Sequence, residues 1–368
     1  MSVLFIGKRF YTNRDALREK YGRIYQLPWH WSRAGIKTRL WLVDYHTRKA
    51  IRETDGALRI VSTPVKSVAL LRYLLSRRFV HDGNPDVVVA SGDCYIGWLG
   101  LRVARRLRAR FVFDVYDKYD EFTGYHTPPG FDLFGYLLAN ADVRLFASRA
   151  LMERAGGAGP SVLVPNGIDT MLFASMDMRT CRKEMGLPEG AVYVGYVGSM
   201  SADRGADDLI AAVQLLRDGG LDVQVLLAGH KDTAVAWTQP FVRYLGNVSY
   251  ARVPIVMGCC DVLALPYRRS DYLDMASSCK IAEYIAMERP LAATKTPNFV
   301  KNYPVAAGRL GKLLAKPSDP HDLARVIAIQ LRNPLSVAIP EGVSWQFIAN
   351  RARADIGLGG VVCGAAVC

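Results

Sequence analysis

Short apolar runs alternate with amphipathic stretches along most of the chain. The runs are rich in Val, Ile, Leu and Phe and lack strict apolar–polar alternation, which is typical of strands buried on both faces of a parallel sheet. Parallel strands are usually joined by helices. We therefore predict an α/β fold of open parallel sheets covered by helices. The predicted strands are 1–7, 38–43, 57–63, 86–90, 111–117, 142–147, 161–164, 192–200, 223–228, 242–245 and 261–265.

Between the strands, apolar residues recur at the spacing of a helix. The first of these stretches, 14–34, contains Pro28, which is expected to kink the helix or split it in two. Residues 67–79 are amphipathic and carry arginines, so this helix either packs on the sheet or lies on a lipid surface. The other predicted helices are 95–107, one that begins at 149, 206–216, 253–259, 277–290, 319–331 and 345–354.

At 368 residues the chain is longer than a single hydrophobic core usually supports, so two domains are expected. The turn-forming sequence Pro165–Asp169 lies near the middle and separates two sets of strands and helices. We therefore predict an N-terminal domain over 1–165 and a C-terminal domain over 166–335. Residues 336–368 follow as a closing helix and a tail of small residues, with the helix a candidate to pack back toward the first domain.

The net charge of +13 is concentrated in the first half of the chain. Residues 1–165 hold 26 Lys/Arg against 15 Asp/Glu, whereas residues 166–368 hold 21 against 19. The excess favours an anionic partner for the first half, either a membrane surface or a phosphate-bearing acceptor, over a solvated surface without a partner. No nucleic-acid module is recognisable, and we expect no nucleic-acid partner.

The cysteines and the apolar segments indicate the compartment. The seven cysteines are odd in number, scattered and without zinc spacing, which favours reduced thiols in the cytosol. No segment approaches the roughly 20 apolar residues of a spanning helix, and the first apolar run is too short for a signal peptide. We therefore expect a cytoplasmic protein, and the basic half extends this expectation to peripheral contact with the inner face of the plasma membrane.

The most informative stretch of the second half is Ser277–Pro290, which follows the apolar run 261–265 and a polar, basic loop. A serine pair suits the start of a helix, and a helix that begins beyond a strand's carboxyl end presents unpaired backbone N–H groups to an anion. Lys280 falls in the first turn, and Glu283 follows on the same face. The lysine suits a phosphate and the carboxylate suits sugar or ribose hydroxyls. The alternative is an ordinary Lys–Glu pair on a surface helix.

In the first half, carboxylates gather where the predicted strand 111–117 ends, at the edge of the sheet where ligands bind in this class of fold. Either they take part in catalysis or one of them caps the following element. A metal site is disfavoured because no matching His/Asp cluster accompanies them. The loop after the first strand is expected at the same kind of edge and offers acceptor-side candidates. The carboxylates are Asp114, Asp117, Asp120 and Glu121, and the loop residues are Lys8, Arg9, Tyr11 and Asn13.

Several short motifs between Pro165 and Thr294 follow one another in the order of a known family. They read Asn-Gly-Ile-Asp, Tyr-Val-Gly-Ser-Met, Arg-Gly, Leu-Leu-Ala-Gly, Cys-Asp-Val-Leu-Ala-Leu-Pro-Tyr and Lys-Ile-Ala-Glu-Tyr. In this order they resemble the nucleotide-sugar glycosyltransferases of the GT-B type, above all the family 4 retaining enzymes. The resemblance implies two Rossmann-like domains whose parallel sheets face each other across a cleft. It is specific over the C-terminal half and weak over the N-terminal half, where acceptors differ.

The resemblance further implies a donor site in the C-terminal domain and no metal ion. Without a divalent cation, the roughly two negative charges of the leaving nucleoside diphosphate must be met by Arg, Lys and helix N-termini. By position, Glu283 matches the family's ribose-binding glutamate and Arg204 matches its diphosphate-binding cation. The donor site is expected to comprise Ser199, Met200, Arg204, Asp274, Ser277, Ser278, Lys280 and Glu283.

Two positions depart from the family's pattern. Met275 stands where the first glutamate of a Glu-x7-Glu motif is expected, and Ser199 stands where an arginine is usual. Lys280, which follows the serine pair, is a candidate to replace the missing cation. Asp274 or Asp271 is a candidate to replace the missing glutamate on the donor sugar.

The resemblance leaves two outcomes open at the anomeric carbon. Gly-Ser-Met at 198–200 and Ser-Ser-Cys-Lys at 277–280 also resemble the family 70 glucuronosyltransferase of xanthan synthesis, an inverting enzyme. In that family an aspartate at the end of a comparable strand is the general base, and Asp117 is the matching position. In a retaining reaction a donor phosphate oxygen takes the proton, and Asp117 positions the acceptor. The larger family favours retention.

These residues predict a glycosyltransferase that moves a hexose or a uronic acid from a UDP- or GDP-linked donor to a saccharide acceptor, lipid-linked in polysaccharide or glycoconjugate assembly. No cofactor is expected besides the donor. The alternative is a non-catalytic GT-B subunit that binds nucleotide-sugar or a partner glycosyltransferase, which the missing glutamate and arginine favour. A dinucleotide-dependent oxidoreductase is disfavoured because no Gly-x-Gly-x-x-Gly follows a predicted strand.

Overall fold

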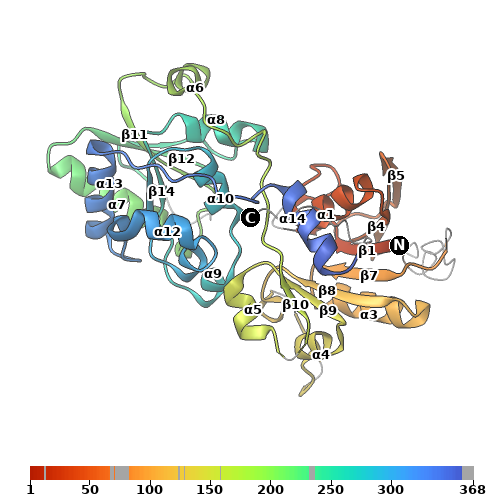
Figure 1. Cartoon of the computed structure of the whole chain (residues 1–368). Helices are drawn as coiled ribbons and strands as arrows, with labels where there is room; N and C mark the ends of the chain where they lie inside the picture. The colour runs from red at the N-terminus through yellow and green to blue at the C-terminus, as the bar shows by residue number, and fades with distance from the viewer. Residues whose placement is uncertain are drawn as a thin grey trace, which may run out of the picture. The chain divides into compact units, whose positions relative to one another are not determined.

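The chain forms two compact units, which Figure 1 shows in a computed structural model. Unit 1 comprises Met1–Gly167 with Ser344–Cys368, and unit 2 comprises Ile168–Val343. The predicted helix 67–79 lies almost wholly outside the described part of the chain. The structure describes residues 1–11, 14–66, 70, 83–122, 125–127, 129–157, 159–231 and 237–358.

Unit 1 is built on an eight-stranded sheet, whose strands in chain order are β1 (Ser2–Lys8), β4 (Lys37–Asp44), β5 (Ile51–Asp55), β6 (Leu58–Pro64), β7 (Val87–Ser91), β8 (Arg110–Val115), β9 (Val143–Phe146) and β10 (Ser161–Leu163). Their order across the sheet is β10-β9-β8-β7-β1-β4-β6-β5, and all neighbours are parallel except β5 and β6. The central strands β1, β7 and β8 are buried along most of their length, as their continuous apolar sequences predict.

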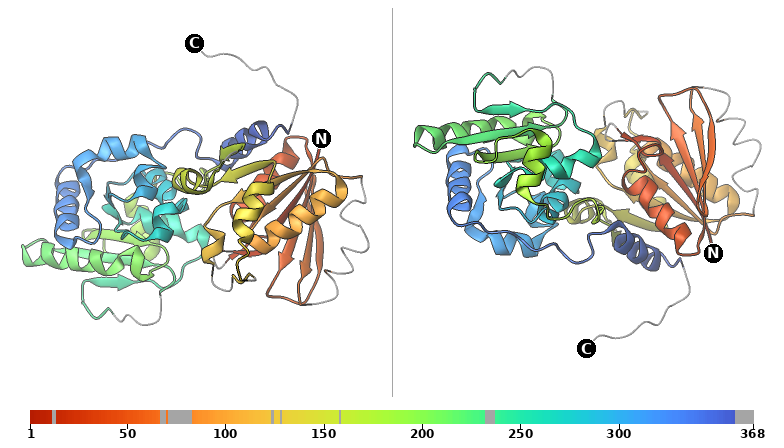
Figure 2. Two further views of the ribbon diagram at one scale, coloured as in Figure 1. Left: turned by 90° about the horizontal axis from the view of Figure 1, so that it is seen from below. Right: turned by 90° about the horizontal axis from the view of Figure 1, so that it is seen from above.

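Helices cover both faces of this sheet, and they are α1 (Gly22–Arg33), α3 (Cys94–Leu107), α4 (Leu133–Asn140), α5 (Arg149–Ala155) and α14 (Trp345–Asp355). Right-handed crossovers place α3 and α4 on one face and α1 on the other, and the opposite views of Figure 2 show the two faces. α14 packs on α1, where Trp31 Nε1 donates to Ala349 O at 2.7 Å. The closing helix thus belongs to unit 1.

The segment before α1 differs from the prediction of one helix over 14–34. Two short strands, β2 (Phe10–Tyr11) and β3 (Arg14–Asp15), pair antiparallel instead. α1 begins only at Gly22, whose φ of 68° lies outside the helical region and therefore fits the start of the helix alone. Pro28 lies inside α1 and does not split it.

Unit 2 is built on a six-stranded sheet, whose strands in chain order are β11 (Val192–Val197), β12 (Val223–Ala228), β13 (Val242–Tyr244), β14 (Val262–Leu265), β15 (Leu291–Thr294) and β16 (Leu314–Ala315). Their order is β13-β12-β11-β14-β15-β16, and every neighbouring pair is parallel. From β11 the chain moves to β12 on one side, while β14 lies on the other side. In open parallel sheets, ligands bind outside the carboxyl ends of the strands at such a switch point.

The helices of unit 2 are α6 (Met178–Met185), α7 (Ala206–Asp218), α8 (Val253–Gly258), α9 (Asp271–Met275), α10 (Cys279–Ala286), α11 (Pro297–Val300), α12 (Pro304–Leu310) and α13 (Pro320–Arg332). α9 lies in a stretch that its polar sequence marks as a loop, and Ser270 Oγ caps it by accepting from Leu273 N at 3.1 Å. α10 is shorter than the predicted helix 277–290. Within the described ranges, no helix has the length and apolarity to cross a membrane.

Candidate functional site

The loops after β11 and β12 approach the start of α10 at two glycines. A Cβ on Gly229, where φ is 126°, would lie 2.1 Å from Gly198 O, so the contact between the two loops requires glycine. A Cβ on Gly198 would lie 3.1 Å from Tyr196 Oη and 3.5 Å from Lys280 Cε. Lys280 therefore lies beside the carboxyl end of β11, at the switch point of the sheet.

Lys280 and Glu283 form an ion pair in the first turn of α10. Lys280 Nζ lies 3.0 Å from Glu283 Oε2, and Tyr250 Oη donates to Oε1 of the same carboxylate at 3.3 Å. The Glu283 side chain is 2 % exposed and that of Lys280 is 26 % exposed. The buried carboxylate is stabilised because a cation and a hydroxyl both donate to it. An ammonium group has three donors, so Lys280 keeps donors for a ligand on its exposed side.

α10 begins without a side-chain cap. Ser278 occupies the N-cap position, but its side chain makes no hydrogen bond to the helix. Its hydroxyl instead lies 3.3 Å from Tyr267 Oη. The partial positive charge of the helix N-terminus therefore lies beside the charge of Lys280, and together they suit an anion.

Arg204 belongs to the loop that follows β11. It ends the short 3-10 helix η3 (Ala202–Arg204), and its guanidinium carbon lies 5.0 Å from the centre of the Tyr267 ring. Its Nε is buried and has no hydrogen-bond partner among the described residues. Burial opposes the charge, but Tyr267, Tyr196 and Asp203 outweigh burial and raise the pKa of the Arg204 guanidinium, which stays charged.

The position of Arg204 depends on the glycine that follows it. Gly205 has φ 69°, and a Cβ at this position would lie 1.9 Å from Pro266 O. A larger residue would displace η3 from the end of β14. Arg268 N donates to Asp203 O at 2.9 Å and joins the same two segments.

Two buried tyrosines lie between the predicted cations. Tyr267 faces Arg204 with its ring and the start of α10 with its hydroxyl. Tyr196 raises the pKa of Arg204, and its hydroxyl lies near the Gly198 that adjoins Lys280. The structure thus gathers Arg204 and Lys280 around one pair of tyrosines. Neither tyrosine was predicted as a site residue, although both belong to motifs that carry the family resemblance.

Ser199 and Met200 take part through their backbone. Ser199 O accepts a hydrogen bond from Tyr196 Oη at 2.7 Å, and Met200 N donates to His230 O at 2.8 Å. The Met200 side chain is buried in the core of unit 2. Both residues therefore hold the loop after β11 in the shape that presents Arg204.

Asp274 lies in α9, in the position next to the missing glutamate. Its Oδ2 accepts from Arg269 Nε at 2.7 Å, whereas its Oδ1 is buried without a partner in the described part of the chain. Met275 is buried, Ser277 lies in the segment that joins the two helices, and Asp271 opens α9. A buried acceptor without a donor calls for a ligand hydroxyl, which favours Asp274 over Asp271 as the replacement.

In unit 1 the carboxylates near the end of β8 have different environments. Asp114 is fully buried, receives hydrogen bonds from Arg23 at 2.9 and 2.6 Å, and receives a third from Ser91 Oγ at 2.6 Å. Asp117 lies beyond the end of β8, is partly exposed, and accepts from Lys118 N at 2.9 Å. Of these two, Asp117 is the one that a ligand can reach. No three His, Cys, Asp or Glu side chains within the described ranges gather as metal ligands would.

Arg9, predicted on the acceptor side, has a structural role in the loop after β1. It is 4 % exposed, and its guanidinium pairs with Asp15 at 2.7 Å and with Asp44 at 2.9 Å. The two carboxylates enclose the cation and tie the β2–β3 hairpin to the end of β4. This ion-pair network takes the place of the predicted acceptor contact.

Lys8 and Tyr11 are partly exposed on either side of Arg9, at the ends of β1 and β2. Lys8 Nζ lies 3.5 Å from Asp93 Oδ2, and the Tyr11 and Tyr116 rings pack with their centroids 5.5 Å apart. Asn13 lies outside the described residues. Lys8 and Tyr11 therefore stay acceptor-side candidates.

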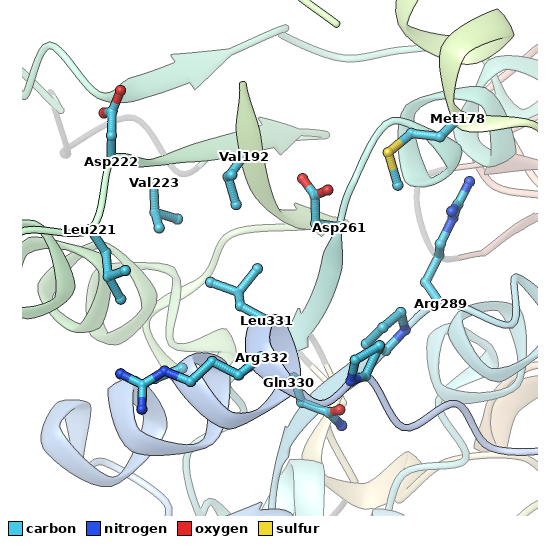
Figure 3. Close-up of a pocket in the computed structure, with 13 residues that line it drawn as sticks. Met178, Val192, Leu221, Asp222, Val223, Asp261, Arg289, Gln330, Leu331 and Arg332 are labelled. Carbon is cyan, nitrogen blue, oxygen red and sulfur yellow. The ribbon is translucent and has the colours of Figure 1, made fainter. Parts of the chain in front are cut away.

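A cavity of about 520 Å³ opens at the amino-terminal edge of the unit 2 sheet (Figure 3). Val192, Val223 and Asp261 line it at the starts of β11, β12 and β14, and Arg289 lies beside them. None of the predicted site residues lines this cavity. The cavity and the cations around Tyr196 and Tyr267 thus lie at opposite edges of one sheet.

The sequence of unit 2 matches a known family, and a curated relative matches about half of the chain. Residues 191–333 match the family described as Glycosyl transferases group 1. The 2-deoxystreptamine glucosyltransferase of Streptomyces kanamyceticus is 30 % identical over 206 residues, which make up 49 % of this chain and 48 % of that protein. The chain therefore spans about half the length of this relative.

Solved structures share the fold over nearly the whole chain. A glycosyltransferase from Rickettsia africae matches with a TM-score of 0.69 at 13 % identity, covering 96 % of this chain and 99 % of that one. Sucrose-phosphate synthase from Thermosynechococcus elongatus gives 0.66 at 15 % identity, with 97 % and 94 % covered. HepE from Anabaena in complex with UDP gives 0.62 at 16 % identity, with 97 % of each covered. These matches confirm the predicted GT-B fold class.

Proposed function

We propose that this chain, which has the GT-B fold and a Glycosyl transferases group 1 domain in unit 2, transfers a hexose or a uronic acid from a nucleotide-sugar donor to a saccharide acceptor. The observation that carries the proposal is the pair of cations around Tyr196 and Tyr267. Arg204 and Lys280 lie where the carboxyl ends of β11 and β14 meet the start of α10. A nucleoside diphosphate is the ligand that such a site fits.

The charge of the leaving group explains why this arrangement suits glycosyl transfer. The bond between the anomeric carbon and the donor phosphate oxygen breaks, and negative charge grows on the diphosphate. Arg204 offers its buried, unpartnered Nε and Lys280 offers its exposed ammonium donors, so both stabilise that charge as it develops. We therefore propose a reaction that needs no divalent ion.

Glu283 is proposed to orient the nucleoside. Its carboxylate oxygens accept one hydrogen bond each from Lys280 and Tyr250, and a carboxylate has further lone pairs for ribose hydroxyls. Asp274 Oδ1, which has no partner in the described chain, is proposed to accept from a hydroxyl of the donor sugar.

On the acceptor side, Asp117 is proposed as the residue closest to the chemistry. In an inverting reaction it takes the proton of the attacking acceptor hydroxyl while the donor phosphate leaves from the opposite side. In a retaining reaction a donor phosphate oxygen takes that proton, and Asp117 holds the acceptor. The basic excess of residues 1–165 supports a lipid-diphosphate-linked saccharide as the acceptor, used in polysaccharide or glycoconjugate assembly at the inner face of the plasma membrane.

Two neighbours suggest the donor to test first. HepE is solved in complex with UDP-glucose as well as UDP, and the curated relative is a glucosyltransferase. Thermal shift with UDP-, GDP-, ADP- and dTDP-sugars in the presence of EDTA is expected to raise the melting temperature with one class of nucleotide. Arg204→Ala and Lys280→Ala should abolish that rise. Lys312→Ala, which removes an exposed cation elsewhere in unit 2, should preserve it. The proposal is wrong if no nucleotide binds or if binding requires a divalent ion.

A non-catalytic GT-B subunit is the second candidate, and Met275 and Ser199 favour it because they stand where a glutamate and an arginine are expected. Release of nucleoside diphosphate from a bound donor separates the two functions. An enzyme releases nucleoside diphosphate, and the rate of release falls in Asp117→Ala, Lys280→Ala and Glu283→Ala. A binding subunit shows the thermal shift but no release in any form of the chain.

A further inference from the structure

The outer side of α3 combines aromatic residues with arginines. Every exposed side chain of this helix is of one kind or the other, and no carboxylate occurs among them. The positions follow the spacing of a single helix side. We refer to this surface as the α3 face, and it consists of Tyr95, Trp98, Arg102, Arg105 and Arg106.

Large aromatic side chains are exposed on or beside the α3 face. Trp98 is 49 % exposed and Phe131, which precedes α4, is 43 % exposed. The Arg102 guanidinium carbon lies 5.6 Å from the centre of the Trp98 ring, and the Phe131 and Tyr136 rings lie 5.7 Å apart. Tryptophan and tyrosine beside arginine are typical of the boundary between lipid and water, where the ring meets acyl chains and the cation meets phosphates.

No carboxylate among the described residues of unit 1 neutralises the positive charge of the α3 face. Arg105 donates to the neutral acceptors Tyr136 Oη at 3.1 Å and Asn140 Oδ1 at 2.6 Å. Neither Arg102, Arg105 nor Arg106 forms an ion pair with a carboxylate in the described part of the chain. The nearby carboxylates have other partners: Asp93 caps α3 and Asp132 caps α4.

We propose that the α3 face docks on the surface of a bilayer that contains anionic lipids. The arginines contact lipid phosphates, and Trp98 and Phe131 enter the boundary between headgroups and acyl chains. Open rings in the same row as the cations fit the lipid–water boundary. A nucleic acid also combines cations with aromatic rings, so the test below includes competition with RNA and heparin. The inference goes beyond glycosyl transfer and does not depend on it.

Sedimentation of the full chain with vesicles tests the proposal. Binding is expected to vesicles of phosphatidylcholine with phosphatidylglycerol and to be much weaker with phosphatidylcholine alone. Each arginine near an anionic surface contributes a factor of about five, so the double variant Arg102→Glu/Arg106→Glu should weaken binding by about 25-fold or more. Trp98→Ala should weaken binding by about ten-fold, and it should do so even in high salt, where the charges are screened.

α14 offers matched controls in the same unit. Phe347 is 52 % exposed, and the Arg351 side chain is 68 % exposed. Phe347→Ala and Arg351→Glu should leave vesicle binding unchanged. Equal losses in the α3 and α14 variants would show general charge attraction and overturn the proposal. Vesicle binding that does not depend on phosphatidylglycerol would also overturn it. So would binding of the chain to RNA or heparin that is tighter than its binding to vesicles. The melting temperature and the nucleotide thermal shift should stay unchanged in every variant, which keeps this test separate from that of the donor site.

Discussion

Unit 1 and unit 2 each place arginines at the carboxyl edge of a parallel sheet, but they use them in opposite ways. In unit 1, Arg9 pairs with two carboxylates and Arg23 pairs with the buried Asp114, and both arginines have almost no exposed surface. In unit 2, Arg204 meets tyrosine rings and keeps an unpartnered Nε, and Lys280 keeps exposed donors beside its single carboxylate. The number of cations in a sequence therefore says little about how many can bind an anion, because the neighbours decide which charges are already matched.

The largest effect is expected at Arg23. Arg23→Met leaves the fully buried Asp114 without its cation and should lower the free energy of unfolding by about 3–5 kcal/mol. Urea denaturation measures this change. The double variant Arg23→Met/Asp114→Leu removes both charges and should recover most of the loss. A loss below about 1 kcal/mol in the single variant would mean that the pair behaves like an exposed salt bridge, and the comparison would fail.

Arg204 should show the reverse behaviour. Arg204→Met removes the donor that is proposed to meet the leaving diphosphate, so kcat/KM should fall by about a hundred-fold to a thousand-fold. The free energy of unfolding should change by less than about 1 kcal/mol, since this guanidinium forms no ion pair with a carboxylate among the described residues. Donor titrations of turnover, with urea denaturation of the same sample, check both values. Strong destabilisation without a kinetic change would give Arg204 a role like that of Arg23.

The enclosed ion pairs of unit 1 should also set its response to acid. Burial would raise the pKa of the Asp44 carboxyl, but hydrogen bonds from Thr47 and His46 and the charge of Arg9 outweigh burial and lower it. Because the folded pKa lies below the unfolded value of about 4, this contribution is complete above that pH and is lost as the pH falls through the folded pKa. Thr47→Val removes one donor to Asp44, so acid unfolding followed by circular dichroism should begin at a higher pH. An unchanged acid transition would contradict this.

The smallest effect is expected at Tyr250. Tyr250→Phe removes the 3.3 Å hydrogen bond to Glu283 Oε1 but leaves the ion pair with Lys280 and the packing against Phe173. A hydrogen bond of this kind contributes about 0.5–1.5 kcal/mol, so the donor Kd should rise by about two-fold to ten-fold. Nucleotide titration by calorimetry measures the change. A loss as large as that of Arg204→Met would place Tyr250 in contact with the donor itself.

The sequence predicted the fold class well because the relevant signal is local. Continuous apolar runs such as 192–197 and 223–228 form interior strands of a sheet, and their apolar pattern alone predicts that they are buried. The start of α1 was predicted wrongly because apolar spacing alone does not reveal a short hairpin or a glycine with positive φ. A helical pattern continues back to Arg14, but pairing of that segment with Phe10–Tyr11 and the positive φ of Gly22 override it.

The candidate site was predictable in part for the same reason. Lys280 and Glu283 share one helix, so their spacing alone shows that they meet. Tyr250 and Tyr267 join them from other segments, and no local pattern separates such residues from ordinary core tyrosines. Arg9 reads as an exposed loop cation because Asp44, which encloses it, lies on another strand. The roles of the predicted donor residues and of Asp117 stay predictions until the variants are measured.

Gly205 has a consequence for anyone who redesigns this chain to use another sugar nucleotide. Gly205 contacts no ligand in the proposed reaction. A Cβ at this position would lie only 1.9 Å from Pro266 O, so residues 201–205 and the strand end at 266 fit together only when residue 205 is glycine. A loop graft that imports only one of these segments would move the Arg204 guanidinium away from the proposed diphosphate, and the result would be mistaken for a failed change of specificity. Exchanging both segments together preserves the packing between them, so that a change in activity reports donor selectivity alone.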